Sequence, residues 1–218
     1  MARRTPAIAA ALAVSAALLL TACGGSNNDA SKDKIKGADE GTKSPSASTS
    51  AATGDGRPDV SVPADLHLNF SFDKPADAAK AAAMGDAENY IRALKHGIVK
   101  QNPEDPAYKF YSYPAAARYA KSQIQAWVKG DWTPTGTDRY FNAEANSVGT
   151  SKSVLVTFCR NQAKSYSKSV KTGKINDVGE SLDSYQKYSL LMAPSTTDGK
   201  VWKAQQIEVQ GRVKECRG

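Results

Sequence analysis

The chain has 218 residues and a formal net charge of +7, and it contains three cysteines and two histidines. Once an N-terminal segment without domain character is set aside, about 160 residues remain, a length that suits one domain with its own core and is short for two. The cysteines and the distant histidines are too few for a zinc site, so no metal is expected. No cofactor is expected either.

The N-terminus has the pattern of a secretory signal. Arg3 and Arg4 form a basic start, and residues 7–20 are almost wholly apolar. This run is shorter than the roughly 20 residues that a membrane-spanning helix needs, and no second apolar run of that length follows. The pattern predicts export of the mature chain. Nucleic acid is therefore not expected as a partner, despite the positive net charge.

The apolar run ends in Leu20, Thr21, Ala22 and Cys23, an order that resembles the bacterial lipobox. In a lipobox the cysteine sulfur receives a diacylglycerol and becomes the first residue, so residues 1–22 are predicted to be a lipoprotein signal peptide and Cys23 the lipidated residue. Two acyl chains of the palmitate kind, at roughly 0.8 kcal/mol per buried CH₂, hold a protein stably on a membrane. The predicted location is the extracytoplasmic face of the cell membrane. The alternative is a soluble secreted protein with an incidental cysteine.

The remaining cysteines are Cys159 and Cys216, 57 positions apart. An even pair in an exported chain indicates a disulfide bond, and closing a loop of that length contributes about 4 kcal/mol in the chain-entropy treatment. The bond would hold the C-terminus against a central strand. The alternative is two free, buried thiols.

Residues 24–59 are built almost entirely from small and polar residues, including the run SPSASTSAATGDG. Such a composition cannot bury enough apolar surface to order itself. Residues 23–59 are therefore interpreted as the lipidated cysteine and a disordered tether that spans roughly 30 to 36 Å on average. Residues 60–218 are the predicted single domain, with 22 Lys and Arg against 16 Asp and Glu.

The first half of the domain predicts an extended lead-in and two helices. Apolar residues alternate through LHLNFSF, which favours a strand. Asp73 is expected to cap a first helix that runs to about residue 100, with Gly85 marking a break or a close contact. A second helix is expected over residues 112–130, opened by Ser112. The apolar positions with helical spacing in the first helix are Ala83, Ala87, Tyr90, Ile91, Leu94 and Ile98.

The second half of the domain predicts an antiparallel sheet. Strands are expected near residues 138–148, 153–169, 182–192 and 201–216, and Asp198-Gly199 marks the last turn as a hairpin. Val154, Val156 and Phe158 lie on one side of an extended strand, and the same alternation places Arg160 on that side, so this strand either leaves the core or contains a bulge. The parity also changes after Ala204, which favours a second bulge and a bent strand.

Helices followed by a long, bent antiparallel meander resemble the NTF2-like cone fold, and the chain resembles actinobacterial surface lipoproteins that carry such a domain. The resemblance rests on LTAC, on TPTGTDRY at residues 133–140, on VLVTFC ending in Cys159, on KTGK at residues 171–174 and on GKVWKAQQIEV…KEC. It implies an α+β domain in which N-terminal helices pack on a bent antiparallel sheet of about four strands. Those lipoproteins carry an acidic residue and a tryptophan soon after the first cysteine, whereas this chain has Arg160, Asn161 and Gln162 there, with Tyr166 further on. If this difference lies in a shared groove, the resemblance implies a different ligand.

The resemblance also implies that the open end of the cone can form a pocket. Enzymes of this shape use a buried carboxylate base with a tyrosine or acid donor. The acids that could act as bases are Asp138, Glu144 and Glu208, and the tyrosine donors are Tyr90, Tyr140 and Tyr188. None has a spacing that demands catalysis, and no nucleophile elbow, phosphate loop or zinc signature is present. The candidate pocket residues are Tyr90, Trp127, Tyr140, Tyr188 and Trp202; core packing is the alternative for each of them. His67 and His96 are expected on the surface.

The segment RNQAKSYSKSVKTGK concentrates positive charge. In an extended chain its first three cations share one side, followed by a basic turn, so the candidate basic face is Arg160, Lys164, Lys168, Lys171 and Lys174. Such a face could dock on wall polyanions or anionic lipid headgroups. Alternatively, the lysines protect an edge strand from pairing between molecules.

Taken together, these features predict a membrane-anchored, extracytoplasmic binding module without enzymatic activity. Its expected partners are the membrane through its lipid anchor and a protein, a wall polyanion or a small apolar ligand, and a homodimer through the open sheet face is a further expectation. The alternative function is a pocket enzyme of the isomerase, cyclase or dehydratase kind. It requires a desolvated acid facing a tyrosine inside the cone.

Overall fold

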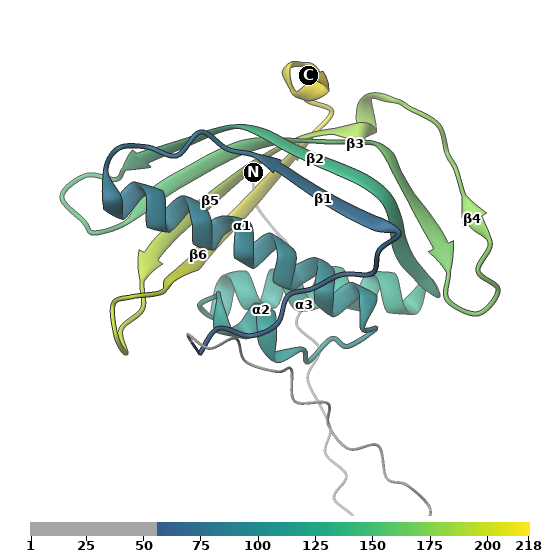
Figure 1. The fold of residues 1–218 in the computed structure, drawn as a ribbon, viewed down its shortest axis with the longest axis horizontal. Helices are drawn as coiled ribbons and strands as arrows, with labels where there is room; N and C mark the ends of the chain where they lie inside the picture. Colours follow the sequence, from purple (N-terminus) through teal and green to yellow (C-terminus); the bar gives the residue numbers. More distant parts are fainter. Residues whose placement is uncertain (1–55) are drawn as a thin grey trace, which may run out of the picture. The chain divides into compact units, whose positions relative to one another are not determined.

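A computed structural model describes residues 56–218. The predicted signal peptide, Cys23 and the predicted tether up to residue 55 lie outside the described residues. The domain is an α+β fold in which three helices pack against one face of a curved six-stranded sheet with strand order β1-β2-β3-β5-β6, and β4 pairs with β3 (Figure 1). The elements are β1 (Leu66–Ser71), α1 (Ala78–Val99), α2 (Pro106–Phe110), α3 (Pro114–Lys129), β2 (Trp132–Ser147), β3 (Val154–Ser169), β4 (Ile175–Asn176), β5 (Tyr185–Pro194) and β6 (Trp202–Gly211).

The sheet differs from the expected one in number and direction of strands. The alternating lead-in does form a strand, β1, with Leu66 and Leu68 buried. However, β1 pairs parallel to β2, from Leu66 opposite Gly136 to Ser71 opposite Phe141. The sheet is therefore mixed rather than antiparallel. It has six strands instead of about four because β1 and the two-residue β4 join the expected meander.

Helix α1 runs without interruption for 22 residues and begins later than expected. Its N-cap is Asp77, whose carboxylate accepts a hydrogen bond from the backbone N–H of Lys80 at 2.9 Å, so Asp73 is not the cap. Gly85 causes neither a break nor a close contact, because a Cβ atom there would meet nothing within 4 Å. The hydroxyl of Tyr90 donates to the backbone oxygen of Ala116 at 2.8 Å and ties α1 to α3.

The predicted second helix corresponds to α3, which ends at a Gly130 cap but has Tyr113, not Ser112, at its N-cap position. The short helix α2 was not expected. It is capped by the Asp105 carboxylate, which accepts from the backbone N–H of Ala107 at 2.8 Å. The α2–α3 junction also covers part of the outer edge of β6, where Tyr113 N–H donates to the Ala204 oxygen at 2.9 Å.

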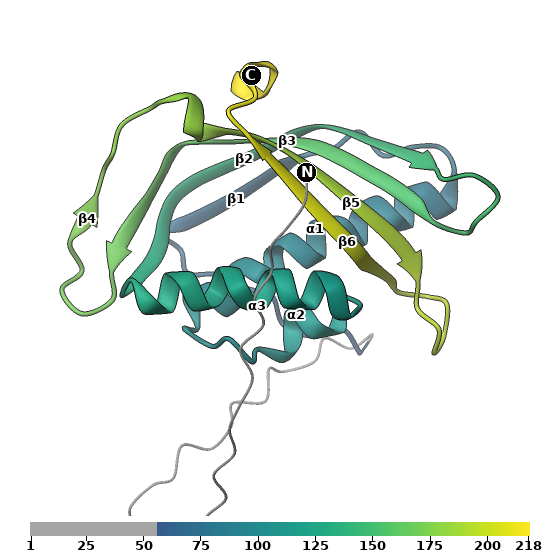
Figure 2. The same cartoon turned by 180° about the vertical axis from the view of Figure 1, so that it is seen from behind.

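The bulge expected after Ala204 is present, and of the two alternatives for the strand that contains Arg160 the structure shows the bulge. In the β2–β3 pair the register shifts between Thr137 and Arg139, so that Asp138 lies opposite two residues of β3. In the β5–β6 pair it shifts between Leu191 and Met192, which leaves Gln205 as the extra residue of β6. Bulges bend strands and increase their twist. A third register shift lies between Phe141 and Glu144 of β2. The three irregularities accompany the curvature that arches the sheet over the helices (Figures 1 and 2).

The main core fills the concave side of the sheet, between the helices and the inward side chains of β2, β3, β5 and β6. A second, small cluster on the other face contains Cys159, Tyr185 and Cys216. Cys159 and Cys216 form the predicted disulfide, with 5.1 Å between their Cα atoms. The bond holds the C-terminal 3-10 helix, Lys214–Arg217, against the central strand β3 on the face opposite the helices (Figure 2).

The lead-in to β1 is bonded to the domain from Arg57 onward, three residues before the expected start. The guanidinium of Arg57 pairs with the buried carboxylate of Asp86 on α1. The backbone oxygen of Ser61 lies 2.7 Å from Nδ1 of His96. Over residues 56–218, no helix combines the length and the apolar character needed to cross a membrane.

Candidate functional site

A charged cluster lies inside the domain, between α1 and the concave face of the sheet. At its centre is Asp138 of β2, which is 0% exposed. One carboxylate oxygen, Oδ2, lies 2.8 Å from Nζ of Lys95 on α1, and the other, Oδ1, accepts from Nη2 and Nε of Arg160 on β3 at 2.7 and 3.1 Å. Arg160 lies opposite Tyr140, two residues from Asp138 along β2, so Arg160 and Asp138 point to the same side of the sheet.

Polar side chains of neighbouring strands complete the cluster. The hydroxyl of Tyr140 donates to Oδ2 of Asp138 at 3.3 Å. The side-chain oxygen of Gln186 accepts from Nη1 of Arg160 at 3.0 Å and from the hydroxyl of Tyr188 at 3.3 Å. Every buried side-chain nitrogen or oxygen among the described residues has a hydrogen-bond partner. Such a fully satisfied network holds its members rigidly.

The cluster carries one negative and two positive groups, and its electrostatics favour a charged Asp138. Burial alone would raise the pKa of this carboxyl, but Arg160 and Lys95 offset burial and hold the pKa well below its usual range. Burial, together with the nearby Arg160, lowers the pKa of Lys95 to about 8. Burial raises the pKa of Tyr140 well above its usual value, and Asp138 adds to this. A carboxylate that two cations stabilise in its ionised form is a weak proton acceptor.

The three acids considered as bases are therefore in different surroundings. Glu144 and Glu208 are exposed. Asp138 alone meets the geometric requirement of a desolvated acid facing a tyrosine, but its partners make it an ion-pair centre. Sequence reasoning missed Lys95, because a lysine within a helix has no feature that distinguishes a buried ion-pair partner from a solvated one.

The candidate pocket residues do not line one pocket. Tyr90, Tyr140 and Tyr188 are core residues, with at most 6% of their surface exposed. Trp127 lines a cavity of about 180 Å³ beneath the β3–β5 connection, which Arg160 also reaches. Trp202 lines a different and larger cleft.

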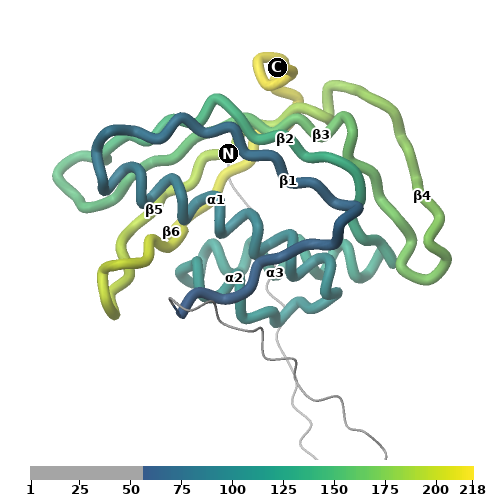
Figure 3. Tube along the Cα trace, viewed as in Figure 1, coloured from purple at the N-terminus to yellow at the C-terminus, as the bar shows by residue number. Residues whose placement is uncertain are grey.

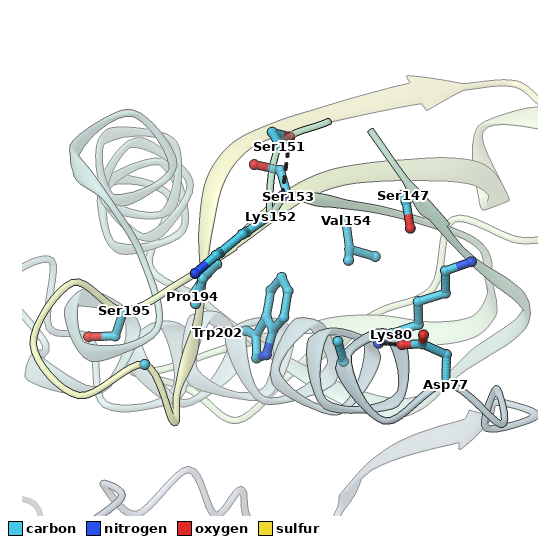
Figure 4. A pocket seen from close by; sticks show the side chains of 12 residues that line it. Asp77, Lys80, Ser147, Ser151, Lys152, Ser153, Val154, Pro194, Ser195 and Trp202 are labelled. Atoms are coloured by element: carbon cyan, nitrogen blue, oxygen red, sulfur yellow. Dashed lines mark hydrogen bonds between the residues drawn. The ribbon is translucent and has the colours of Figure 1, made fainter. Parts of the chain in front are cut away.

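The larger cleft has a volume of about 500 Å³ and lies where the start of α1, the β2–β3 turn and the β5–β6 turn meet. In Figure 4 the indole of Trp202 stands between the side chains of Lys80 and Lys152. Four serines also line the cleft; these are Ser147, Ser151, Ser153 and Ser195. The carboxylate of Asp77, at one end, is used in capping α1.

The two lysines of the cleft differ from those lysines of the domain that form ion pairs. No ion pair to a described residue forms at Lys80 or Lys152, whereas Lys95, Lys109, Lys121 and Lys168 each have a carboxylate partner. The cleft therefore offers two ammonium groups, serine hydroxyls and the small exposed part of the Trp202 indole, which is 8% exposed and otherwise packs in the main core. Sequence reasoning identified only Trp202, because the other groups come from three turns that are distant in the chain.

Trp202 is held in place by a buried carboxylate of helix α1. Its backbone N–H donates to Oδ2 of Asp86 at 2.8 Å, and the same carboxylate accepts from the side chain of Asn89 at 3.2 Å and pairs with Arg57. A buried carboxylate with three partners fixes the strand start that carries the indole. The floor of the cleft is thus a preformed surface.

The candidate basic face is divided by the structure. Arg160 is buried, with 7% of its surface exposed, and belongs to the Asp138 cluster rather than to the face. Lys168 pairs with Asp65 beside β1. Lys164, Lys171 and Lys174 are exposed. The physical reason is the bulge, which reverses the parity of β3 after Arg160.

His67 is exposed, as expected, but His96 is not. His96 is 1% exposed, and its Nε2 lies 3.9 Å from Oδ2 of the buried Asp105. The prediction of a surface position failed because the lead-in to β1 covers this side of α1. Among residues 56–218, no three potential metal ligands come together.

The fold and these sites define a class rather than a family: a disulfide-bonded α+β domain in which helices cover the concave face of a curved mixed sheet, with an open, cationic cleft at one end. Searches found no matching family model, no matching curated protein and no matching solved structure.

Proposed function

We propose that the protein is an extracytoplasmic binding protein that holds an anionic carbohydrate, such as a segment of a wall polyanion, in the cleft at Trp202. The observation that carries the proposal is the pair of lysines without carboxylate partners on either side of an indole. Ammonium groups attract carboxylates or phosphates, hydroxyls exchange hydrogen bonds with sugar hydroxyls, and an indole packs against the apolar face of a sugar ring.

Export and anchoring are part of the same proposal. The basic start, the apolar run and the LTAC motif support a lipid anchor at Cys23. The disulfide supports an oxidising, extracytoplasmic compartment. Helices that precede a curved, bulged sheet support the NTF2-like cone as the fold family, although the parallel β1 is an addition to the expected meander. The ionised Asp138 favours binding over catalysis.

Binding of anionic oligosaccharides tests the proposed ligand class. An oligogalacturonate should bind in a titration followed by Trp fluorescence and calorimetry, whereas neutral dextran oligomers of equal length should not. Lys80→Gln and Lys152→Gln should each weaken binding by about fivefold to tenfold, because each removes one charge-assisted contact worth about 1 to 1.5 kcal/mol. The proposal predicts weaker binding at high salt as well.

Lys187→Gln is the matched control, because Lys187 is an exposed lysine on β5 that lines none of the clefts described above. It should leave the affinity unchanged within a factor of two. Equal loss in all three variants would mean that net charge, not the cleft, attracts the ligand. Equal binding of dextran would contradict the role of the lysines.

A further inference from the structure

Four large apolar side chains are exposed among the described residues, and three of them lie on the connection between β3 and β5. Val170 is 47% exposed, Ile175 53% and Val178 84%; Val148, at the β2–β3 turn, is the fourth. Apolar surface gathered at one projecting segment indicates contact with another phase or molecule. Figure 3 shows this connection, which includes β4, extending beyond the rest of the sheet.

The tip of the connection, residues 170–175, combines two of these side chains with two lysines in the sequence VKTGKI. Lys171 and Lys174 are both exposed, and their one ion pair with a described residue joins Nζ of Lys171 to Oδ1 of Asp131 at 4.0 Å. Lys129, in the last turn of α3, adds a further exposed cation next to Asp131. The return strand carries Asp177, whose carboxylate accepts from the backbone N–H of Gly179 at 2.8 Å.

The tip is a rigid turn rather than a loose loop. Ser169 N–H donates to the Lys174 oxygen at 2.9 Å, and Gly173 N–H donates to the Ser169 oxygen at 2.9 Å. Gly173 has φ of +71°, a conformation that favours glycine. Val170 N–H donates to the Asp131 oxygen at 2.9 Å and joins the tip to the α3–β2 turn. These bonds define the backbone from which the exposed Val170 and Ile175 side chains extend.

We infer that the 170–175 tip docks on the anionic surface of a lipid bilayer, with Val170 and Ile175 at the headgroup level and Lys171 and Lys174 against lipid phosphates. Two exposed β-branched side chains that flank a pair of lysines match an interface that is apolar below and negatively charged above. In Figures 1 and 2 the tip and the start of the described chain lie on the same side of the sheet as the helices, opposite the C-terminal 3-10 helix. The tip therefore projects on the side of the sheet where the described chain begins.

This inference rests on the membrane-proximal location in the proposed function but not on the cleft. Flotation of the full-length Cys23→Ala chain with vesicles tests this inference. The change removes the predicted acylation site, so vesicle binding depends on the protein surface alone, and the variants differ only at the positions tested. The probes are vesicles with and without 30% phosphatidylglycerol in phosphatidylcholine. Lys171→Gln/Lys174→Gln should lower partitioning onto the anionic vesicles by about tenfold or more, since each lysine near such a surface contributes about fivefold, or 1 kcal/mol. Val170→Ser/Ile175→Ser should lower it severalfold.

Two control variants change the same residue types, an exposed valine and an exposed lysine, at positions outside the tip. Val148→Ser removes the exposed valine of the β2–β3 turn, and Lys187→Gln removes an exposed lysine of β5; both should change partitioning less than twofold. Unchanged partitioning of the tip variants would overturn the inference. The inference would also be overturned if the tip variants lost binding to soluble polyglutamate as strongly as binding to vesicles, because the tip would then be a general polyanion site. Binding of oligogalacturonate, measured on the same tip variants, should persist and separates this inference from the cleft.

Discussion

Asp138 shows how much one buried charge decides in this domain. Its carboxylate contacts both Lys95 and Arg160, so Asp138→Asn leaves two buried cations without a counter-charge. Breaking a buried ion pair in this way costs about 3 to 5 kcal/mol, and we expect the free energy of unfolding, measured in urea, to fall by that amount. Glu144→Gln, at an exposed acid of the same strand, should change it by less than about 0.5 kcal/mol.

At the same cluster, Lys95→Met should not lower the free energy of unfolding. The change removes the surplus positive charge, keeps a similar side-chain volume and leaves Asp138 paired with Arg160. Burial lowers the pKa of Lys95 to about 8, whereas an unfolded lysine titrates near about 10.4. Between these pH values the unfolded chain binds more protons at this site than the folded chain, so the stability of the wild type should rise with pH.

The rise should reach about 3 kcal/mol between pH 7 and 10.5 at about 1.4 kcal/mol per pKa unit, and it should be absent in Lys95→Met. At pH 7 the variant should be as stable as the wild type or more stable. Parallel pH profiles of the two proteins, measured by urea unfolding, would show that Lys95 does not titrate with folding.

At the scale of elements, two glycines of α1 separate helix propensity from packing. Gly85 faces open space, so Gly85→Ala should stabilise the protein by about 0.5 to 1 kcal/mol. A Cβ atom on Gly97 would lie 2.6 Å from Cδ1 of Ile124 on α3, and Gly97→Ala should therefore destabilise by about 1 to 3 kcal/mol. Thermal unfolding followed by circular dichroism measures both. A loss of stability in Gly85→Ala would reveal a constraint on α1 other than space.

At the scale of the whole molecule, the disulfide closes the loop from the central strand to the C-terminus. Cys159→Ala/Cys216→Ala should lower stability by about 4 kcal/mol, because the unfolded chain regains the entropy of an open loop of 57 residues. Reduction of the wild type should reproduce the change in thermal midpoint, whereas Cys23→Ala should leave the midpoint unchanged. A reductant effect on the double variant would indicate a cause other than this bond.

Local patterns in the sequence were sufficient for much of the architecture. Helical spacing located α1 and α3, alternation located β1, β3 and β6, and the even pair of cysteines indicated the bond between Cys159 and Cys216. The change of parity after Ala204 indicated the bulge of β6, whereas the pattern through Phe158 and Arg160 left a bulge in β3 as one of two alternatives. These features follow from periodicity and from pairing of like residues, and both are properties of short stretches of chain.

Only the tertiary structure decided which strands are neighbours and which side chains meet. The parallel pairing of β1 with β2 depends on where α1 returns the chain, and the cluster of Lys95, Asp138 and Arg160 joins three elements. The cleft likewise combines Lys80, Lys152 and Trp202 from three separate segments. A charged residue looks the same in a sequence whether water or a buried partner surrounds it, because its partner is chosen by the fold and not by its neighbours in the chain.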